Sequence, residues 1–153
     1  MKAFKPVLTE HINEKECHTL SFYKSVGGYS ALEKVLKMDP QEVIQEVKDS
    51  NLRGRGGAGF STGMKWGFIP KDSPKPTYLI NNADESEPGT FKDRLLMNKA
   101  PHQMLEGMII AAYAIGCQTA FIYIRGEFYK EFQLLEKVMA EAYENNPLGQ
   151  NIF

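Results

Sequence analysis

Apolar residues recur at helical spacing in the first third of the chain. Ser30 and Glu33 form the S-x-x-E pattern of a capping box, which predicts that a helix begins at Ser30. Asp39 and Pro40 predict the start of a second helix, because aspartate is a favoured N-cap and proline suits the first turn. That helix has to end before the glycine-rich stretch that follows it. The apolar faces of the two helices are Leu32, Val35 and Leu36, and Val43, Ile44 and Val47.

Two further helices are expected in the second half of the chain. Pro101 begins the first of them, and Gly116 stands where a helix stop is expected. The other follows the turn at Gly126 and Glu127. The apolar face of the first helix is Leu105, Met108, Ile109 and Ala112. That of the second is Phe128, Phe132, Leu135, either Val138 or Met139, and Ala142.

Short runs of β-favouring residues complete the pattern. Residues 77–82 predict a buried strand, residues 119–124 predict another, and residues 19–23 predict a short strand within an otherwise aperiodic first stretch. The order strand, helix, strand, helix implies a parallel sheet with helices packed against it. We therefore expect an α/β fold in residues 29–153, with a Rossmann-like parallel sheet flanked by helices. Residues 1–28 are expected to form a helical or extended N-terminal arm.

Composition narrows the class of protein. The chain has 18 basic and 19 acidic residues and a net charge of −1, so no global charge attracts it to nucleic acid or to an anionic membrane. Cys17 and Cys117 lack CxxC spacing, which argues against a disulfide framework and fits a reduced, cytosolic setting. No window approaches the roughly 18 apolar residues of a membrane span. His11, His18 and His102 are scattered, so metal catalysis has little support.

A glycine-rich loop spans residues 54–60. Gly54, Gly56, Gly57 and Gly59 allow the backbone to reach positive φ and to lie against a flat or phosphorylated ligand. The stretch matches G-x-G-x-x-G, but it follows a predicted helix rather than a strand, and it lacks the Lys-Ser/Thr of a P-loop. Two interpretations stay open for the loop alone: a nucleotide-binding loop, and a flexible turn with a cationic rim.

Cationic and aromatic side chains surround this loop. Arg53, Arg55 and Lys65 place three positive charges near the exposed amides, which favours phosphate or pyrophosphate binding. Phe60 and Phe68 offer rings that can stack on an adenine or a flavin. Taken singly, each of these side chains also has an ordinary explanation, as a solvated arginine or a core phenylalanine.

A carboxylate-rich loop follows the predicted strand at residues 77–82. Asp84, Glu85 and Glu87 crowd three carboxylates into four positions, which is repulsive unless cations or hydroxyl donors face them. Open α/β sheets bind ligands at the carboxyl ends of their strands, where ribose or ribityl hydroxyls are suitable donors. The alternative is a solvated turn ahead of Pro88.

Two long motifs carry a resemblance to a known family. They are Asn51-Leu-Arg-Gly-Arg-Gly-Gly-Ala-Gly-Phe-Ser-Thr-Gly-Met-Lys-Trp66 and Asn82-Ala-Asp-Glu-Ser-Glu-Pro-Gly-Thr-Phe-Lys-Asp-Arg94. Together with Tyr123-Ile-Arg-Gly-Glu127, they resemble the NADH- and FMN-binding subunit of respiratory complex I, the NADH:quinone oxidoreductase. They also resemble the diaphorase subunits of NAD-linked hydrogenases and formate dehydrogenases. The family usually has proline where this chain has Ser61, which should alter loop stiffness more than chemistry.

The resemblance implies an NADH-oxidising flavoprotein module, in which hydride passes from NADH to FMN and electrons then reach iron–sulfur clusters. No catalytic protein acid is needed for that step, because the cofactor carries the chemistry. Phe60 and Phe68 match positions that stack on the NADH adenine, and Glu87 matches one that contacts NADH. Asn82, Asp84 and Glu85 match positions that contact FMN. The expected cofactor-binding residues are Gly54, Arg55, Gly56, Gly57, Ala58, Gly59, Phe60, Lys65, Phe68, Asn82, Asp84, Glu85 and Glu87.

The resemblance also implies a larger setting. In the family the polypeptide continues into further FMN-binding strands, a ubiquitin-like domain and a helical domain with a [4Fe–4S] cluster, so residues 29–153 are expected to be the N-terminal part of an FMN- and NADH-binding domain. The implied partners are a thioredoxin-like [2Fe–2S] subunit and a multi-cluster iron–sulfur subunit, on the inner face of the cell membrane. An exposed apolar sheet edge is expected at the C-terminal end.

Two alternatives to this function stay open. The first is a truncated nucleotide-binding or assembly module without independent activity. The second is a diaphorase subunit of an NAD-linked hydrogenase or formate dehydrogenase. Bound flavin separates the first alternative from an intact flavoprotein.

Overall fold

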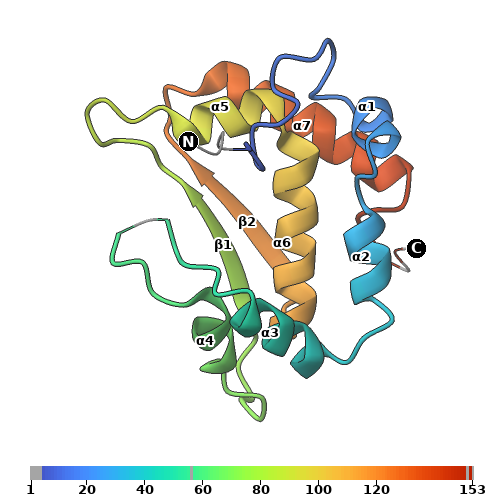
Figure 1. Ribbon diagram of the computed structural model, residues 1–153, viewed down its shortest axis with the longest axis vertical. Helices are drawn as coiled ribbons and strands as arrows, with labels where there is room; N and C mark the ends of the chain where they lie inside the picture. The colour runs from blue at the N-terminus through green and yellow to red at the C-terminus, as the bar shows by residue number, and fades with distance from the viewer. Residues whose placement is uncertain (1–4, 56, 151, 153) are drawn as a thin grey trace.

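Helix α6 (Pro101–Ile115) lies at the centre of the fold, and every other helix and strand of the described chain packs against it (Figure 1). The structure is a computed structural model that describes residues 5–55, 57–150 and 152. The other elements are, in chain order, α1 (Leu20–Ser25), α2 (Ser30–Val35), α3 (Pro40–Asp49), α4 (Thr62–Gly67), β1 (Tyr78–Ala83), α5 (Lys92–Lys99), β2 (Thr119–Ile124) and α7 (Tyr129–Glu144).

The two strands form a parallel sheet. Tyr78 lies opposite Thr119 at one end, and Ala83 lies opposite Ile124 at the other, so the carboxyl ends of the strands are level. Helices α5 and α6 connect the strands, and α6 runs alongside them in Figure 1. The predicted strands at residues 77–82 and 119–124 and the predicted α/β class with a parallel sheet are therefore confirmed.

The sheet is packed on one face only. Ala83, Ile122 and Ile124 contribute to a buried cluster with residues of α5 and α7. The prediction that the first strand is buried is wrong for the opposite face, because nothing packs on it within the described chain. That face carries exposed large apolar side chains, namely Tyr78 (55%), Ile80 (64%), Phe121 (54%) and Tyr123 (59%). Parallel sheets are normally covered on both faces, and the exposed apolar surface here includes a whole face rather than an edge alone.

The predicted strand at residues 19–23 is wrong, because these residues lie in and next to α1. The Thr19 hydroxyl accepts a hydrogen bond from the Phe22 N–H at 3.3 Å and so caps the helix. Leu20 is buried in a cluster with Leu32 and Ile109. A local cap and a buried leucine therefore outweigh the β propensity of this short run.

Helix α2 begins at Ser30 as predicted, but the predicted capping box is absent. The Ser30 hydroxyl donates backwards to the Gly27 carbonyl at 2.6 Å, and the N-cap is Tyr29, whose φ of 66° is left-handed. In α3 the predicted cap is confirmed. Asp39 accepts from the Gln41 N–H at 2.7 Å, and the Glu42 carboxylate accepts from the Asp39 N–H at 3.0 Å.

Helices α6 and α7 confirm the two predictions for the second half of the chain. Gly116 ends α6 with a φ of 68°, a left-handed conformation that favours glycine. Buried α7 residues Leu135, Val138 and Ala142 pack toward α6 and β2. Helices α4 and α5 were not predicted, because both are short and neither carries a clear apolar stripe.

Candidate functional site

The glycine loop is closed at its neck by backbone hydrogen bonds. The Gly54 N–H donates to the Phe60 carbonyl at 2.8 Å, and the Thr62 N–H donates to the Leu52 carbonyl at 2.9 Å. An isolated antiparallel bridge pairs residues 53 and 61 between them. The two ends of the loop are thus held together by hydrogen bonds, immediately before α4.

The backbone within the loop requires glycine at two positions. Gly57 has a φ of 140° and Gly59 a φ of 64°, both of which side chains rarely adopt. A Cβ at either position would meet no atom within 4 Å, so the requirement is conformational rather than steric. Ala58 lies exposed between them, and Gly56 lies outside the described residues. The described loop residues 54, 55, 57, 58 and 60 are exposed and residue 59 is partly exposed, so this surface is open to a ligand.

Two cations beside the loop are available to an anion. Arg55 and Lys65 are exposed, and neither is in an ion pair within the described part of the chain. Arg53 instead donates from Nη1 to the Gly59 carbonyl at 3.5 Å, so it supports the loop. Positive charge and an exposed glycine-rich backbone lie together here, which is the composition of a phosphate-binding loop.

Two aromatic rings stand at the ends of α4. Phe60 and Phe68 have ring centroids 5.9 Å apart, and their exposed fractions are 49% and 66%. Neither is a core residue, so the alternative of two ordinary core phenylalanines does not hold. Helix α4 is capped by Ser61, whose hydroxyl accepts from the Met64 N–H at 3.4 Å. Ser61 therefore has a capping role at the position where the resembled family has proline.

Helix α4 approaches α3 closely. A Cβ on Gly63 would lie 2.5 Å from the backbone nitrogen of Lys48 in α3, so only glycine fits at this contact. Lys65 and Phe68, which follow Gly63 in and just after α4, are consequently held at a fixed distance from α3.

The acidic loop begins where β1 ends. Asn82 is exposed on the strand, and its Oδ1 accepts from the Asp84 N–H at 3.0 Å. The Asp84 carboxylate accepts from the Ser86 hydroxyl at 2.9 Å. Asp84 and Glu87 are both exposed, so their carboxylates are accessible to hydroxyl donors.

Glu85 differs from its neighbours. It is 5% exposed, and its carboxylate accepts from the Asp93 N–H at 2.7 Å and from the Arg94 N–H at 3.1 Å. N–H groups in the first turn of a helix have no partner within the helix, so Glu85 caps α5 by accepting from two of them. Asp84 and Glu87 are thus exposed, whereas the Glu85 carboxylate is buried among structural partners.

Arg125 joins the ends of the two strands, a role that the sequence pattern did not reveal. Its Nη1 donates to the Glu85 carbonyl at 3.1 Å, and its Nη2 donates to Glu127 at 2.8 Å. The guanidinium also lies 5.7 Å from the centre of the Phe128 ring. The backbone N–H of Glu127 and the Arg125 guanidinium hold the pKa of Glu127 below its usual value. The signal that could have revealed this role is an arginine directly after one strand of a parallel pair, when an acidic loop directly follows the other strand.

Figure 1 shows how the two loops lie relative to the sheet. The acidic loop extends beyond the arrowhead of β1, and the glycine loop lies further toward the start of that strand, on the same side of the molecule. The expected site residues therefore fall in two segments, the glycine loop with α4 and the acidic loop after β1. The structure pairs Phe60 with Phe68 and Asn82 with Asp84, and it turns the Glu85 carboxylate toward α5.

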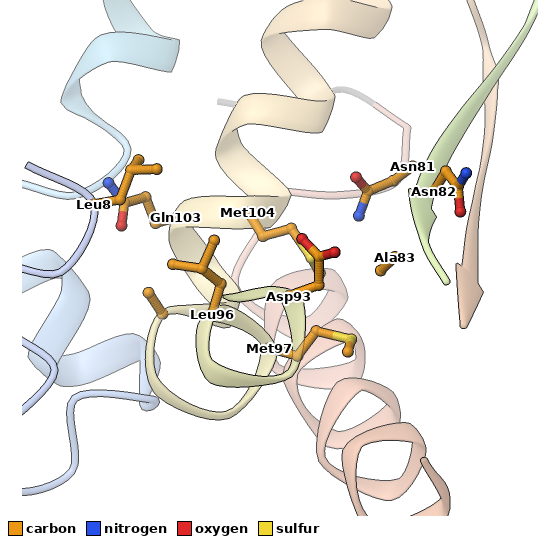
Figure 2. A pocket seen from close by; sticks show the side chains of 10 residues that line it. Leu8, Asn81, Asn82, Ala83, Asp93, Leu96, Met97, Gln103 and Met104 are labelled. Carbon is orange, nitrogen blue, oxygen red and sulfur yellow. The ribbon is translucent and has the colours of Figure 1, made fainter. Parts of the chain in front are cut away.

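A small cavity of about 160 Å³ lies between β1, α5 and α6 (Figure 2). In that view Asn81 and Asp93 point toward its centre, and Met97 and Met104 form apolar parts of the wall. Of the expected cofactor-binding residues, only Asn82 lines it. A wider hollow of about 410 Å³ near Trp66 contains none of them. The expected site is therefore an exposed surface in this chain rather than either cavity.

A buried polar cluster lies away from both loops. The Nδ1 atom of His102 is 2.9 Å from the Tyr29 hydroxyl, and its Nε2 is 3.4 Å from the Glu141 carboxylate, without hydrogen-bond geometry. Burial lowers the pKa of His102, and Glu141 acts against that shift. Burial and the nearby Glu106 raise the pKa values of Tyr23 and Tyr29. His102 is thus a packing residue.

The described residues contain neither a membrane span nor a metal site. No helix among them is both long enough and apolar enough to cross a bilayer. No group of three or more histidine, cysteine, aspartate or glutamate side chains in this part of the chain is arranged to hold a metal ion.

Known proteins resemble this chain along most of its length. It is 54% identical over 150 residues to the F 2 subunit of the NADH-quinone oxidoreductase of Rhizobium meliloti, covering 97% of this chain and 36% of that protein. It is 51% identical over 151 residues to the F subunit of the same enzyme in Streptomyces coelicolor, covering 99% and 34%. The chain thus spans about a third of the length of these curated relatives.

A solved structure shares the fold. The crystal structure of NAD+-reducing [NiFe]-hydrogenase in the H2-reduced state matches with a TM-score of 0.68 and 37% identity, over 89% of this chain and 22% of that one. The sequence model of the Nuo51 FMN-binding domain matches residues 47–152, which is more than half of the chain. The chain therefore belongs to the family of the Nuo51 FMN-binding domain.

Proposed function

We propose that this chain forms the FMN- and NADH-binding part of an NADH:quinone oxidoreductase. The family membership and the names of the relatives in Rhizobium meliloti and Streptomyces coelicolor support the assignment. Because the chain spans about a third of those relatives, the activity of the whole protein is part of the proposal.

The observation that carries the proposal is that the chain has both an exposed glycine loop with exposed cations beside it and an exposed acidic loop at the carboxyl end of β1. The glycine loop is exposed and has the cations Arg55 and Lys65 beside it, which suits the phosphates of a nucleotide. Asp84 and Glu87 are exposed carboxylates, which suits ribose or ribityl hydroxyls. The residues present therefore fit both FMN and NADH.

Each group of residues has a proposed role. The exposed rings of Phe60 and Phe68 stack on the adenine of NADH, and Lys65 neutralises phosphate. Asn82 and Asp84 orient FMN, and Glu87 orients NADH. Glu85 contributes to the site through the shape of its loop. The proposed cofactor-binding set remains Gly54, Arg55, Gly56, Gly57, Ala58, Gly59, Phe60, Lys65, Phe68, Asn82, Asp84, Glu85 and Glu87.

Bound FMN would supply acceptance of a hydride from NADH and release of single electrons toward iron–sulfur centres. The protein groups bind and orient the two ring systems, and orientation of this kind accounts for a large share of catalysis in such reactions. We propose a thioredoxin-like [2Fe–2S] subunit and a multi-cluster iron–sulfur subunit as the partners that receive the electrons. The assembly would act on the inner face of the cell membrane.

A diaphorase subunit of an NAD-linked hydrogenase is the second candidate. It is favoured by the fold match to NAD+-reducing [NiFe]-hydrogenase at 37% identity. The relatives named as quinone oxidoreductase subunits are more similar in sequence, at 54% and 51% identity, and this supports the first candidate.

Separate titrations of the purified chain with FMN and with NADH test the proposal. Lys65→Met should weaken NADH binding about tenfold, because it removes a cation from the phosphate site. Asp84→Asn should weaken FMN binding and leave NADH binding nearly unchanged. Lys130→Met, at an exposed position of α7, is the matched control and should change neither affinity. NADH binding without FMN binding would favour a nucleotide-binding module without independent activity, and binding of neither would contradict the proposal.

A further inference from the structure

We propose that Arg125 is a positioning residue of the cofactor site, which holds the acidic loop in the shape that presents Asp84 and Glu87. The identity of the ligand rests on the proposed function, whereas the contacts of Arg125 do not.

The position of Arg125 follows from the register of the sheet. Ala83 and Ile124 are partners at the carboxyl ends of β1 and β2. Arg125 comes directly after its strand, and Glu85 follows two residues after the other. The bond from Arg125 Nη1 to the Glu85 carbonyl, at 3.1 Å, therefore joins two loops whose residues are 40 positions apart in the sequence.

Glu85 is consequently fixed on both sides. Arg125 holds its carbonyl, while the backbone N–H groups of Asp93 and Arg94 hold its carboxylate. Its neighbours Asp84 and Ser86 are exposed, whereas Glu85 is buried. One anchored residue thus fastens the loop to α5 and leaves the adjacent carboxylate outside.

Arginine suits this place better than lysine. One nitrogen of the guanidinium reaches Glu85 and another reaches Glu127 at 2.8 Å, and the planar group lies over the Phe128 ring. A lysine ammonium lacks this planar fork of N–H donors and stacks less well on an aromatic ring. The side chain of Arg125 is 33% exposed, and the ion pair that it forms with Glu127 is exposed on the glutamate side.

Matched variants of the whole chain test the role. Arg125→Met removes the contact, and Arg125→Lys keeps the charge without the fork. Arg94→Met is one control, because its guanidinium lies 6.0 Å from the centre of the same Phe128 ring, and its side chain donates to no atom of the acidic loop among the described residues. Glu127→Gln is the other control, since it weakens the exposed ion pair and leaves the Glu85 contact in place.

Two readouts are measured for each variant: hydrogen exchange over residues 84–94, and FMN affinity by fluorescence titration. Arg125→Met should speed the exchange and raise the FMN dissociation constant, each about tenfold, with a melting temperature close to that of the wild type. Arg125→Lys should recover part of both losses, and the two controls should resemble the wild type.

Unchanged exchange over residues 84–94 in Arg125→Met would overturn the proposal. So would a rise in the FMN dissociation constant that Arg94→Met reproduces, because that would indicate a general packing effect. If the wild-type chain binds neither FMN nor NADH, the proposed function is contradicted, and the exchange comparison alone still decides whether Arg125 anchors the loop.

Discussion

The carboxylate of Glu106, in the middle of α6, accepts a hydrogen bond from the backbone N–H of Tyr29 at 2.9 Å. Its other oxygen accepts from the Leu32 N–H at 2.9 Å, and the Tyr23 hydroxyl also donates to the carboxylate. Glu106 is only 6% exposed. A single buried carboxylate therefore fixes the left-handed turn before α2 and attaches the N-terminal segment to the rest of the fold.

Replacing this carboxylate should destabilise the protein. Glu106→Gln places an amide N–H₂ group among donors, so the free energy of unfolding should fall by about 2–3 kcal/mol. Urea unfolding followed by circular dichroism measures the change. Glu136→Gln, at an exposed position of α7, is the control and should change the stability by less than about 0.5 kcal/mol. Equal effects of the two substitutions would contradict the role of Glu106.

His102 should make stability depend on pH. Burial lowers its pKa in the folded state, while Tyr29, Glu141, His18 and Lys24 are the titratable or charged groups that act on it. A lowered pKa means that the unfolded chain binds the proton more tightly. The contribution of His102 is therefore present above the unfolded value of about 6.5 and is lost as the pH falls through the lower, folded value.

The comparison of unfolding free energies at about pH 7.5 and about pH 5.5 checks this expectation. The loss on acidification should be smaller in His102→Gln than in the wild type. His11→Gln serves as the control, because His11 lies outside the buried cluster, and it should retain the full loss. An identical pH dependence in all three proteins would show that His102 is not a source of the effect.

Two glycines in helices should respond to alanine in opposite directions. A Cβ at Gly63 would lie 2.5 Å from the Lys48 backbone nitrogen, so Gly63→Ala should push α4 from α3 and cost about 1–3 kcal/mol. A Cβ at Gly107, in α6, would meet no atom within 4 Å, so Gly107→Ala should stabilise the chain by up to about 1 kcal/mol. Thermal unfolding of both variants gives the signs, and a stabilising Gly63→Ala would contradict the close contact of the two helices.

The sequence predicted those elements whose signals are local and repeated. Asp39 and Pro40 combine a cap with a proline at the first turn, and α3 has the predicted cap. Thr19 and Ser30 show the limit of such signals. The Thr19 hydroxyl caps a helix where a strand was expected, while the Ser30 hydroxyl bonds backwards to Gly27. Which backbone group a hydroxyl contacts depends on the turn before it, and Glu106 holds that turn from a distant helix.

The candidate site likewise has one part that could be predicted from the sequence and one part that could not. The glycine loop was apparent from composition, since positive φ at Gly57 and Gly59 is a property of single residues. The burial of Glu85 beside exposed carboxylates was not apparent, because its partners are Arg125, 40 positions away, and backbone N–H groups at the start of α5. The close spacing of the acidic residues suggested that the Glu85 carboxylate faces a ligand, whereas in the fold this carboxylate caps α5.

The open face of the sheet should bind hydrophobic dyes. Phe121 and Tyr78 form an exposed aromatic pair with centroids 6.1 Å apart. Phe121→Thr should lower the fluorescence of a bound naphthalene sulfonate dye, because it interrupts the apolar patch. Tyr143→Ser removes an aromatic side chain with a similar exposed fraction, 61%, from α7 and should leave the fluorescence nearly unchanged. Equal loss in both variants would contradict the assignment of dye binding to the sheet face.

The proposed function requires this chain to hold FMN and NADH together in the geometry of hydride transfer. To test this, the purified chain is loaded with FMN, oxygen is removed, and the visible flavin band is followed as NADH is added. We expect NADH to bleach the band and NAD+ to leave it unchanged. A chain that retains no flavin, or one whose flavin band does not respond to NADH, would show that the two cofactors are not held in this way.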